Sequence, residues 1–147
     1  MGKIFQLIKK TNLMISQLEF ILYVSNQEKS RNFYQILLQQ NPSLDVPGMT
    51  EFTINEFVKI GLMPNDGISK IITPKLPNPT SGNGIPRCEL YLQVENIKTV
   101  FEAAKQAGAT EISPITLRDW GDYVGYLADF DGHVIALASK SIRNFDI

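Results

Sequence analysis

Apolar residues recur at every second position in two stretches of the chain, 18–24 (LEFILYV) and 88–94 (CELYLQV). This alternation predicts a half-buried β-strand in each stretch. Both strands carry a glutamate near their start, Glu19 and Glu89, seventy residues apart. These two glutamates need an explanation, because a carboxylate is rarely buried inside an apolar strand without a partner.

A helical pattern follows each of these strands. In 27–40 and 97–108, apolar residues recur at intervals of three and four, which predicts an amphipathic helix in each range. Asn26 and Asn96 stand directly before the helices and suit the N-cap position. Gly108 suits the end of the second helix. The matching order of elements indicates an internal repeat.

Short strands are predicted after each helix. The first half predicts strands at 49–54 and 58–64, and a brief strand before Pro47 fits the same pattern. The second half predicts strands at 110–118, 123–129 and 134–139, the last two joined by a turn that contains Asp131 and Gly132. Each half therefore follows the order βαβββ.

This repeat sets the expected domain organisation. We expect an N-terminal extension at 1–17, a single domain at 18–140 and a C-terminal tail at 141–147. Within the domain, module one covers about 18–64 and module two covers 87–140. The connection at 65–86 is rich in Pro, Gly, Asn and Ser, so we expect it to be long and partly irregular. The predicted fold class is α+β, with two paired modules.

Composition narrows the classes of function. The net charge is -1 and no basic run is present, so the electrostatic signature of a nucleic-acid-binding protein is missing. No apolar stretch reaches the length of a membrane span. The single cysteine, Cys88, excludes an internal disulfide, is compatible with a reducing cytoplasm, and is expected to be a small core residue.

Three motifs give the repeat a family resemblance. They are YVSNQEKSRNFY (23–34), LQVENIKTVFEAAKQAGA (92–109) and RDWGDYVGYLADFDGHVIALAS (118–139). In this order they resemble the vicinal oxygen chelate superfamily, which includes glyoxalase I, the bleomycin-resistance proteins and the extradiol dioxygenases. The resemblance implies that each module curls its sheet toward a half-open, barrel-like cavity.

The resemblance also implies where a metal would be held. In this superfamily, the first strand of each module and the last strand of the second module supply the ligands. Those positions fall on Glu19, Glu89 and Ala136 in this sequence, and Gly61 is the equivalent position in module one. Alanine has no donor atom, so we expect an incomplete metal site and no cofactor. A divalent metal held by the two glutamates is the alternative.

Strand alternation independently places the glutamates on a mixed face. Glu19 and Tyr23 share one face of the first strand, and Glu89 and Tyr91 share one face of its repeat. The opposite, apolar faces are expected to pack against the helices. We therefore expect the mixed faces to line a cavity or an interface, with these ligand-binding candidates: Glu19, Tyr23, Glu89, Tyr91, Trp120 and Tyr126.

Several functional interpretations follow. The leading one is a cytoplasmic small-molecule-binding protein of the glyoxalase/bleomycin-resistance type, whose carboxylates suit a cationic ligand. The alternative is a divergent glyoxalase-class lyase or isomerase with Glu19 and Glu89 as catalytic groups, one of them with a pKa raised by repulsion and burial. A structural or dimerisation module is a third class, and we expect a homodimer in any case.

A structural interpretation competes with these roles. Each glutamate can instead be solvated, or paired with an arginine such as Arg87 or Arg118. The only histidine, His133, is expected to be a solvated turn residue.

Overall fold

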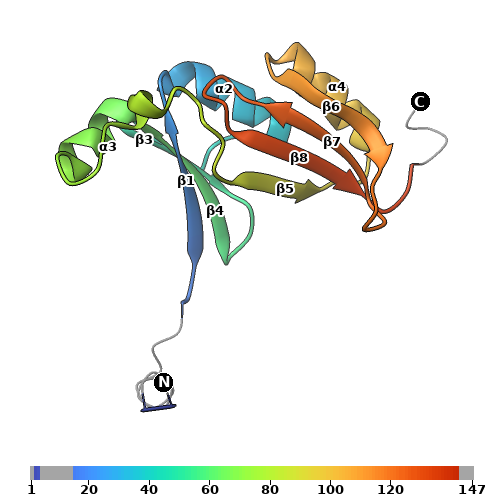
Figure 1. The fold of residues 1–147 in the computed structure, drawn as a ribbon, viewed down its shortest axis with the longest axis horizontal. Helices are drawn as coiled ribbons and strands as arrows, with labels where there is room; N and C mark the ends of the chain where they lie inside the picture. Colours follow the sequence, from blue (N-terminus) through green and yellow to red (C-terminus); the bar gives the residue numbers. More distant parts are fainter. Residues whose placement is uncertain (1, 4–14, 143–147) are drawn as a thin grey trace.

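The computed structural model describes residues 2–3 and 15–142, which contain two α+β modules (Figure 1). The predicted N-terminal extension and C-terminal tail lie largely outside the described residues. The fold class and the two-module organisation predicted from the sequence are confirmed.

Module one contains a four-stranded sheet and one helix. Its elements are β1 (Leu18–Val24), α2 (Gln27–Leu38), β2 (Leu44–Val46), β3 (Met49–Thr53) and β4 (Val58–Pro64). The strand order is β1-β4-β3-β2. Strands β1 and β4 run parallel, whereas β4, β3 and β2 form an antiparallel meander. The brief strand expected before Pro47 is therefore present as β2.

Module two repeats this arrangement. Its elements are β5 (Glu89–Gln93), α4 (Ile97–Gln106), β6 (Thr110–Leu117), β7 (Tyr123–Ala128) and β8 (Val134–Ser139). The strand order is β5-β8-β7-β6, with β5 parallel to β8. The internal repeat is thus confirmed element by element, and neither four-stranded sheet closes into a barrel.

The connection between the modules is more regular than expected. It contains α3 (Asn65–Ile72) and the short 3-10 helix η1 (Pro79–Gly82). The sequence pattern does not predict α3, because its eight residues include Gly67 and span few helical turns. A helix of this length depends on tertiary contacts, and α3 packs against β1, β4 and η1.

The main core lies between the two sheets and their helices. Helices α2 and α4 lie next to each other over the inner faces of the sheets (Figure 1). Alternation in β1 buries Leu22 and Val24 in this core, as predicted, although Phe20 on the same face stays 46% exposed. The largest fully buried side chains include Phe33, Tyr34, Phe52, Ile97, Leu127 and Leu137. Burial of each large apolar side chain contributes about 1.5–3 kcal/mol.

The helix ends follow the sequence signals in part. The side chain of Asn26 accepts a hydrogen bond from the backbone N–H of Lys29, as expected of an N-cap. Asn96 occupies the N-cap position of α4 as predicted, but its side chain makes no capping hydrogen bond. Gly108 has φ +116°, a left-handed conformation that explains why glycine follows α4.

The prediction that Cys88 is a core residue is wrong. Cys88 is exposed, because β5 begins only at Glu89 and strand alternation does not extend to the residue before it.

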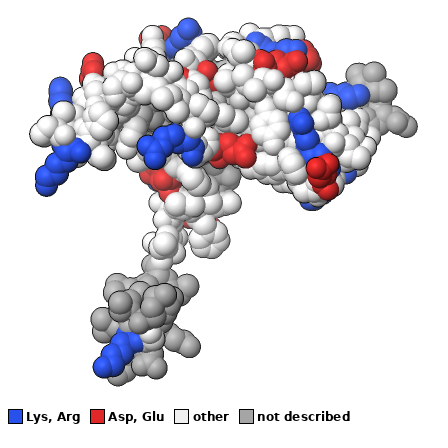
Figure 2. Space-filling view, in the orientation of Figure 1, with Lys and Arg blue, Asp and Glu red and all other residues white. Residues whose placement is uncertain are grey.

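Charge and hydropathy add two observations. Lysines and arginines are interspersed with acidic residues over the face drawn in Figure 2, without a broad patch of one sign among the described residues. Among those same residues, every helix is too short or too polar to cross a bilayer.

Candidate functional site

Each sheet has a second face, directed away from the helix-covered core. On the first sheet we call it the carboxyl face, formed by Glu19, Ile21, Met49, Glu51 and Gly61. On the second sheet we call it the aromatic face, formed by Glu89, Tyr91, Gln93, Trp120, Asp122 and Tyr126. The mixed faces predicted from alternation therefore exist on both sheets.

A gap in the carboxyl face accommodates Glu19. Gly61 in β4 lies opposite Ile21 of β1 and Glu51 of β3. A Cβ atom at Gly61 would stand 2.7 Å from Oε1 of Glu19 and 3.3 Å from Cγ1 of Ile21. The carboxyl group of Glu19 occupies space that only glycine leaves free.

The surroundings of Glu19 disfavour its charge. Burial, followed by the hydrogen bond and negative charge of Glu51, raises the pKa of Glu19 from its usual 4.5 to about 7, although Lys59 opposes the rise. Nζ of Lys59 lies 3.7 Å from Oε1 of Glu51. With both carboxyls ionised, Oε1 of Glu19 is buried and has no hydrogen-bond donor among the residues that the structure describes. Glu19 is therefore the group that can hold or release a proton near neutral pH.

Glu51 is the partner that sequence reasoning missed. The expected pair was Glu19 with Glu89, but Glu89 belongs to the other sheet, is exposed, and makes no hydrogen bond or ion pair with Glu19 in the described structure. Glu51 alternates onto the carboxyl face of β3 and pairs with Gly61 in register. Only the strand order brings it to Glu19, because β4 lies between β1 and β3.

The metal-ligand positions of the superfamily are poorly filled. Ala136 is fully buried in β8, between Tyr91 of β5 and Tyr126 of β7, and offers no donor. Gly61 offers none either, and the two glutamates at the remaining positions are on different sheets. This donor set does not fit a tetrahedral transition-metal site.

A buried carboxylate organises the aromatic face. Asp122 is only 3% exposed. Its Oδ2 accepts hydrogen bonds from the Tyr91 hydroxyl at 2.5 Å and from Nε2 of Gln93 at 3.1 Å, and its Oδ1 accepts one from Nζ of Lys140 at 2.6 Å. Nε1 of Trp120 donates to the Tyr91 hydroxyl at 2.9 Å. Asp122 therefore fixes two of the predicted ligand-binding residues.

Electrostatics agree with this geometry. The hydrogen bond from Lys140, followed by that from Tyr91, holds the pKa of Asp122 below its usual value. Burial and the bond to Asp122 raise the pKa of the Tyr91 phenol, so it stays protonated and donating. Two predicted ligand-binding residues remain. Tyr126 lies on the aromatic face, with the Arg118 guanidinium 5.1 Å from its ring centre. Tyr23 lies in β1 of the other sheet and is 36% exposed.

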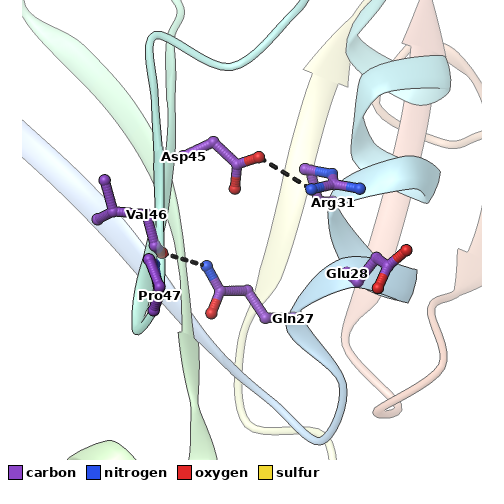
Figure 3. A pocket seen from close by; sticks show the side chains of 6 residues that line it. All are labelled: Gln27, Glu28, Arg31, Asp45, Val46 and Pro47. Carbon is purple, nitrogen blue, oxygen red and sulfur yellow. Dashed lines mark hydrogen bonds and ion pairs between the residues drawn. The ribbon is translucent and has the colours of Figure 1, made fainter.

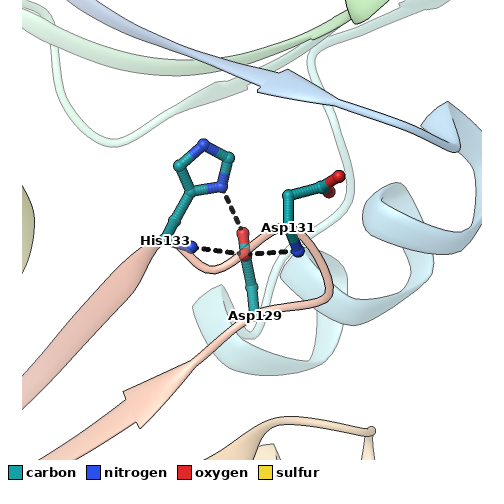
Figure 4. A group of neighbouring side chains, drawn as sticks. All are labelled: Asp129, Asp131 and His133. Carbon is teal, nitrogen blue, oxygen red and sulfur yellow. Dashed lines mark hydrogen bonds and ion pairs between the residues drawn. The ribbon is translucent and has the colours of Figure 1, made fainter. Parts of the chain in front are cut away.

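A separate polar cluster joins the two modules. Oδ2 of Asp129 accepts a hydrogen bond from the Tyr34 hydroxyl of α2 at 2.6 Å. The same oxygen lies 2.8 Å from Nδ1 of His133 (Figure 4). Its Oδ1 accepts from the backbone N–H groups of Asp131 and His133. The backbone N–H of Ser25 donates to Asp131 at 2.9 Å.

These bonds indicate a structural role for the cluster. Asp129, Asp131 and His133 lie close enough to hold a cation, but the oxygens of Asp129 already accept these bonds. The expectation that His133 is a solvated turn residue is wrong, because it is half-buried and paired with Asp129. Burial disfavours the imidazolium, but the bond and charge of Asp129 outweigh it and raise the pKa of His133.

A shallow depression of about 330 Å³ lies between α2 and the β2–β3 turn (Figure 3). Three of its polar side chains, those of Gln27, Arg31 and Asp45, bond to other parts of the protein. Arg31 pairs with Asp45 at 2.9 Å, and Nε2 of Gln27 donates to the carbonyl of Val46 at 2.8 Å. Oε1 of Gln27 accepts from the backbone N–H of Gly48. The depression therefore marks where α2 anchors the hairpin.

Comparison with known proteins gives matches over most of the chain. The family model described as "Glyoxalase-like domain" matches residues 18–142. An uncharacterized protein of Mycobacterium bovis is 33% identical over 91 residues, which are 60% of this chain and 59% of that protein. An uncharacterized protein of Mycobacterium tuberculosis has the same identity over 53% of its length. The match therefore spans little more than half of these relatives.

Solved structures share the fold. A glyoxalase-related enzyme from Fulvimarina pelagi has a TM-score of 0.73 at 19% identity, covering 86% of this chain and 88% of that one. A glyoxalase/bleomycin resistance protein/dioxygenase family enzyme from Burkholderia phytofirmans has a TM-score of 0.68 at 16% identity, covering 86% and 98%. An Agrobacterium tumefaciens protein solved by NMR has a TM-score of 0.67 at 27% identity, covering 87% and 99%.

Proposed function

The chain belongs to the glyoxalase-like domain family, and from that premise we propose that it is a small-molecule-binding protein of the glyoxalase/bleomycin-resistance type. The observation that carries the proposal is the buried Oε1 of Glu19, which has no donor within the described part of the chain when Glu19 and Glu51 are both ionised. A buried acceptor without a partner costs about 1–3 kcal/mol. A ligand that brings a positively charged N–H donor to this oxygen would remove that cost, so we propose a cationic ligand.

We propose that binding does not depend on a metal or another cofactor. The support is the donor set, since Ala136 and Gly61 replace ligand-bearing residues and Glu89 lies on a different sheet from Glu19. Two isolated carboxylates leave a transition metal mostly hydrated. Elemental analysis of the purified protein is expected to find far less than one zinc, nickel or iron per chain, and about one metal per chain would contradict this.

We also propose a cytoplasmic homodimer. The exposed thiol of Cys88 suits a reducing compartment. Strands β1 and β5 are at the edges of their sheets, and β1 exposes Leu18, Phe20 and Ile21 at 40–48%. Exposed apolar edge strands favour pairing with another chain. Light scattering is expected to give a dimer mass that Phe20→Lys reduces to the monomer mass, whereas a monomeric wild type would contradict the proposal.

A thermal-shift screen tests the binding function. Small organic cations and neutral compounds of matched size are tested against the wild type and Glu19→Gln. We expect a cation to raise the melting temperature of the wild type at pH 8, where Glu19 is ionised, and to raise that of Glu19→Gln much less. Glu89→Gln is the matched control, because Glu89 is exposed on the other sheet. Equal shifts in all three proteins would contradict a role of the carboxyl face.

A divergent lyase or isomerase is the second candidate. It is favoured by the pKa of about 7 at Glu19, since a base poised near the working pH serves proton abstraction. We propose Glu19 as the catalytic base in that case, with Glu51 in place of Glu89 as its neighbour. Exchange of the α-proton of a bound carbonyl compound with deuterated solvent tests this, and exchange that persists in Glu19→Gln would exclude it.

A further inference from the structure

The aromatic face carries a group whose role the proposed function leaves unexplained. Asp122 is a nearly fully buried carboxylate that sits under a surface rather than in the main core. Around it, Val124, Ala136 and Ala138 form a second small apolar cluster, separate from the core between sheets and helices, with Tyr126 packed against it. Placing a charge beside such a cluster is costly unless every oxygen is bonded.

The bonds of Asp122 serve to hold aromatic side chains in place. The Tyr91 hydroxyl donates to Asp122 and accepts from the indole N–H of Trp120, so one carboxylate fixes Tyr91 directly and Trp120 through it. Gln93, from the same face of β5, bonds the same oxygen. An exposed tryptophan is normally free to change rotamer. Trp120 is 57% exposed, but its only polar atom, Nε1, is held by the hydrogen bond to Tyr91.

What this surface offers a ligand follows from the bonds already made. The hydroxyl proton of Tyr91 and the N–H of Trp120 are engaged within the protein, and Lys140 balances the charge of Asp122. Trp120 stays 57% exposed and Tyr91 39% exposed although their polar atoms are bonded, and the exposed Glu89 lies at the start of β5 on the same face. Fixed aromatic rings without free donors favour stacking over hydrogen bonding or charge pairing.

We propose that Asp122 is the positioning residue of a preformed stacking platform, made of Tyr91 and Trp120, that binds a flat aromatic group of the ligand. The inference rests on the proposed small-molecule-binding function and adds the chemical class recognised by this face. It differs from the role of the carboxyl face, where charge decides binding.

Trp120 supplies the readout, because it is the only tryptophan of the chain. In ¹⁵N-labelled protein its indole N–H gives one resonance, whose position reports the hydrogen bond to Tyr91. Quinoline, a neutral flat probe at pH 8, is titrated against N-methylquinolinium, its cationic counterpart, and tetramethylammonium, a cation without a ring. We expect both flat probes to move the indole resonance saturably with millimolar affinity, and tetramethylammonium to leave it in place.

Two variants test the positioning role. Asp122→Asn should shift the indole resonance before any probe is added and weaken quinoline binding at least fivefold, because an amide cannot accept all three bonds. Asp119→Asn is the matched control in the same turn, since Asp119 is exposed and makes no hydrogen bond within the described residues, and it should bind quinoline as the wild type does. If Asp122→Asn fails to fold, Tyr91→Phe, which keeps the ring and removes the hydroxyl, should give the same two effects.

Five results would overturn the inference. Unchanged quinoline affinity in the folded variants would remove the positioning role. Binding of the two cations without quinoline would assign this face to charge, and no response to any probe would remove the stacking site. An indole resonance that moves on dilution of the protein would show a second copy on this face. A screening hit that needs Glu19 but leaves the indole resonance in place would overturn this inference while the proposed function stands.

Discussion

Replacing Tyr34 by phenylalanine should destabilise the protein without changing its packing. The Tyr34 ring is fully buried, and its hydroxyl donates to Oδ2 of Asp129, whose side chain is 1% exposed, at 2.6 Å. Burial, together with the charge of Asp129, raises the pKa of the Tyr34 phenol, so the hydroxyl remains a donor at any ordinary pH. Tyr34→Phe removes this donor and leaves a buried carboxylate with one bond fewer.

The magnitude follows from the charge on the acceptor. A hydrogen bond to a charged group contributes about 1.5–3 kcal/mol, roughly twice a bond between neutral groups. Phenylalanine keeps the ring contacts with Phe33, whose centre lies 5.0 Å away, so no cavity term is added. We therefore expect Tyr34→Phe to lower the free energy of unfolding by about 2 kcal/mol and the melting temperature by about 5 °C.

Urea unfolding at pH 6.5 measures this change. With an m-value of about 2 kcal/mol/M, the midpoint should fall by about 1 M while the slope stays constant. Tyr23→Phe is the matched control, because the Tyr23 hydroxyl makes no hydrogen bond within the described part of the chain; it should change stability by less than about 0.5 kcal/mol. A loss below that limit for Tyr34→Phe would refute the reasoning that this bond stabilises the packing of the two modules.

Three further predictions concern titration and space. Because the pKa of Glu19 is raised to about 7, the free energy of unfolding of the wild type should fall as pH rises from 4.5 to 7. Urea unfolding should show that Glu19→Gln abolishes this fall and has a free energy of unfolding about 1 kcal/mol higher than the wild type at pH 8. The control Glu89→Gln should show neither effect. Gly61→Ala should push the carboxyl of Glu19 into solvent and return its pKa toward 4.5 in a ¹³C NMR titration; a pKa still near 7 would contradict the space argument. Asp129 raises the pKa of His133, so the ion pair between them stabilises the fold fully below pH 6.5, and this stabilisation is lost as pH rises through the folded pKa of His133. Melting curves of His133→Gln should not show this loss of stability with rising pH. A pH profile identical to that of the wild type would exclude the ion pair as the source of the loss.

Local patterns in the sequence determined the elements of this protein. Alternation in 18–24 and 88–94 predicted β1 and β5, and intervals of three and four predicted α2 and α4. The turn that contains Gly132 was predicted from its dipeptide, and Gly132 has φ +85° there. These signals are legible because strand period, helix period and left-handed turns depend on residues within a few positions of each other.

Tertiary structure alone decided which side chains meet. The sequence paired Glu19 with Glu89, but strand order places Glu19 next to Glu51 and Gly61. No sequence pattern singled out Asp122. Its bonded side chains come from β5 and from the end of β8, and Trp120, which is bonded to it through Tyr91, comes from the β6–β7 turn. In both cases strand order, which no local period encodes, sets the neighbours.

The same reason explains the cluster around Asp129. Its partner Tyr34 is 95 residues away in sequence, and its bond depends on how α2 packs against the turn of module two. Strand and helix periods say which face of an element is apolar, but the partner of a polar atom on that face depends on the order and packing of whole elements. The sequence therefore determined the modules and their repeat, whereas the fold decided which carboxylates are paired, buried or free to meet a ligand.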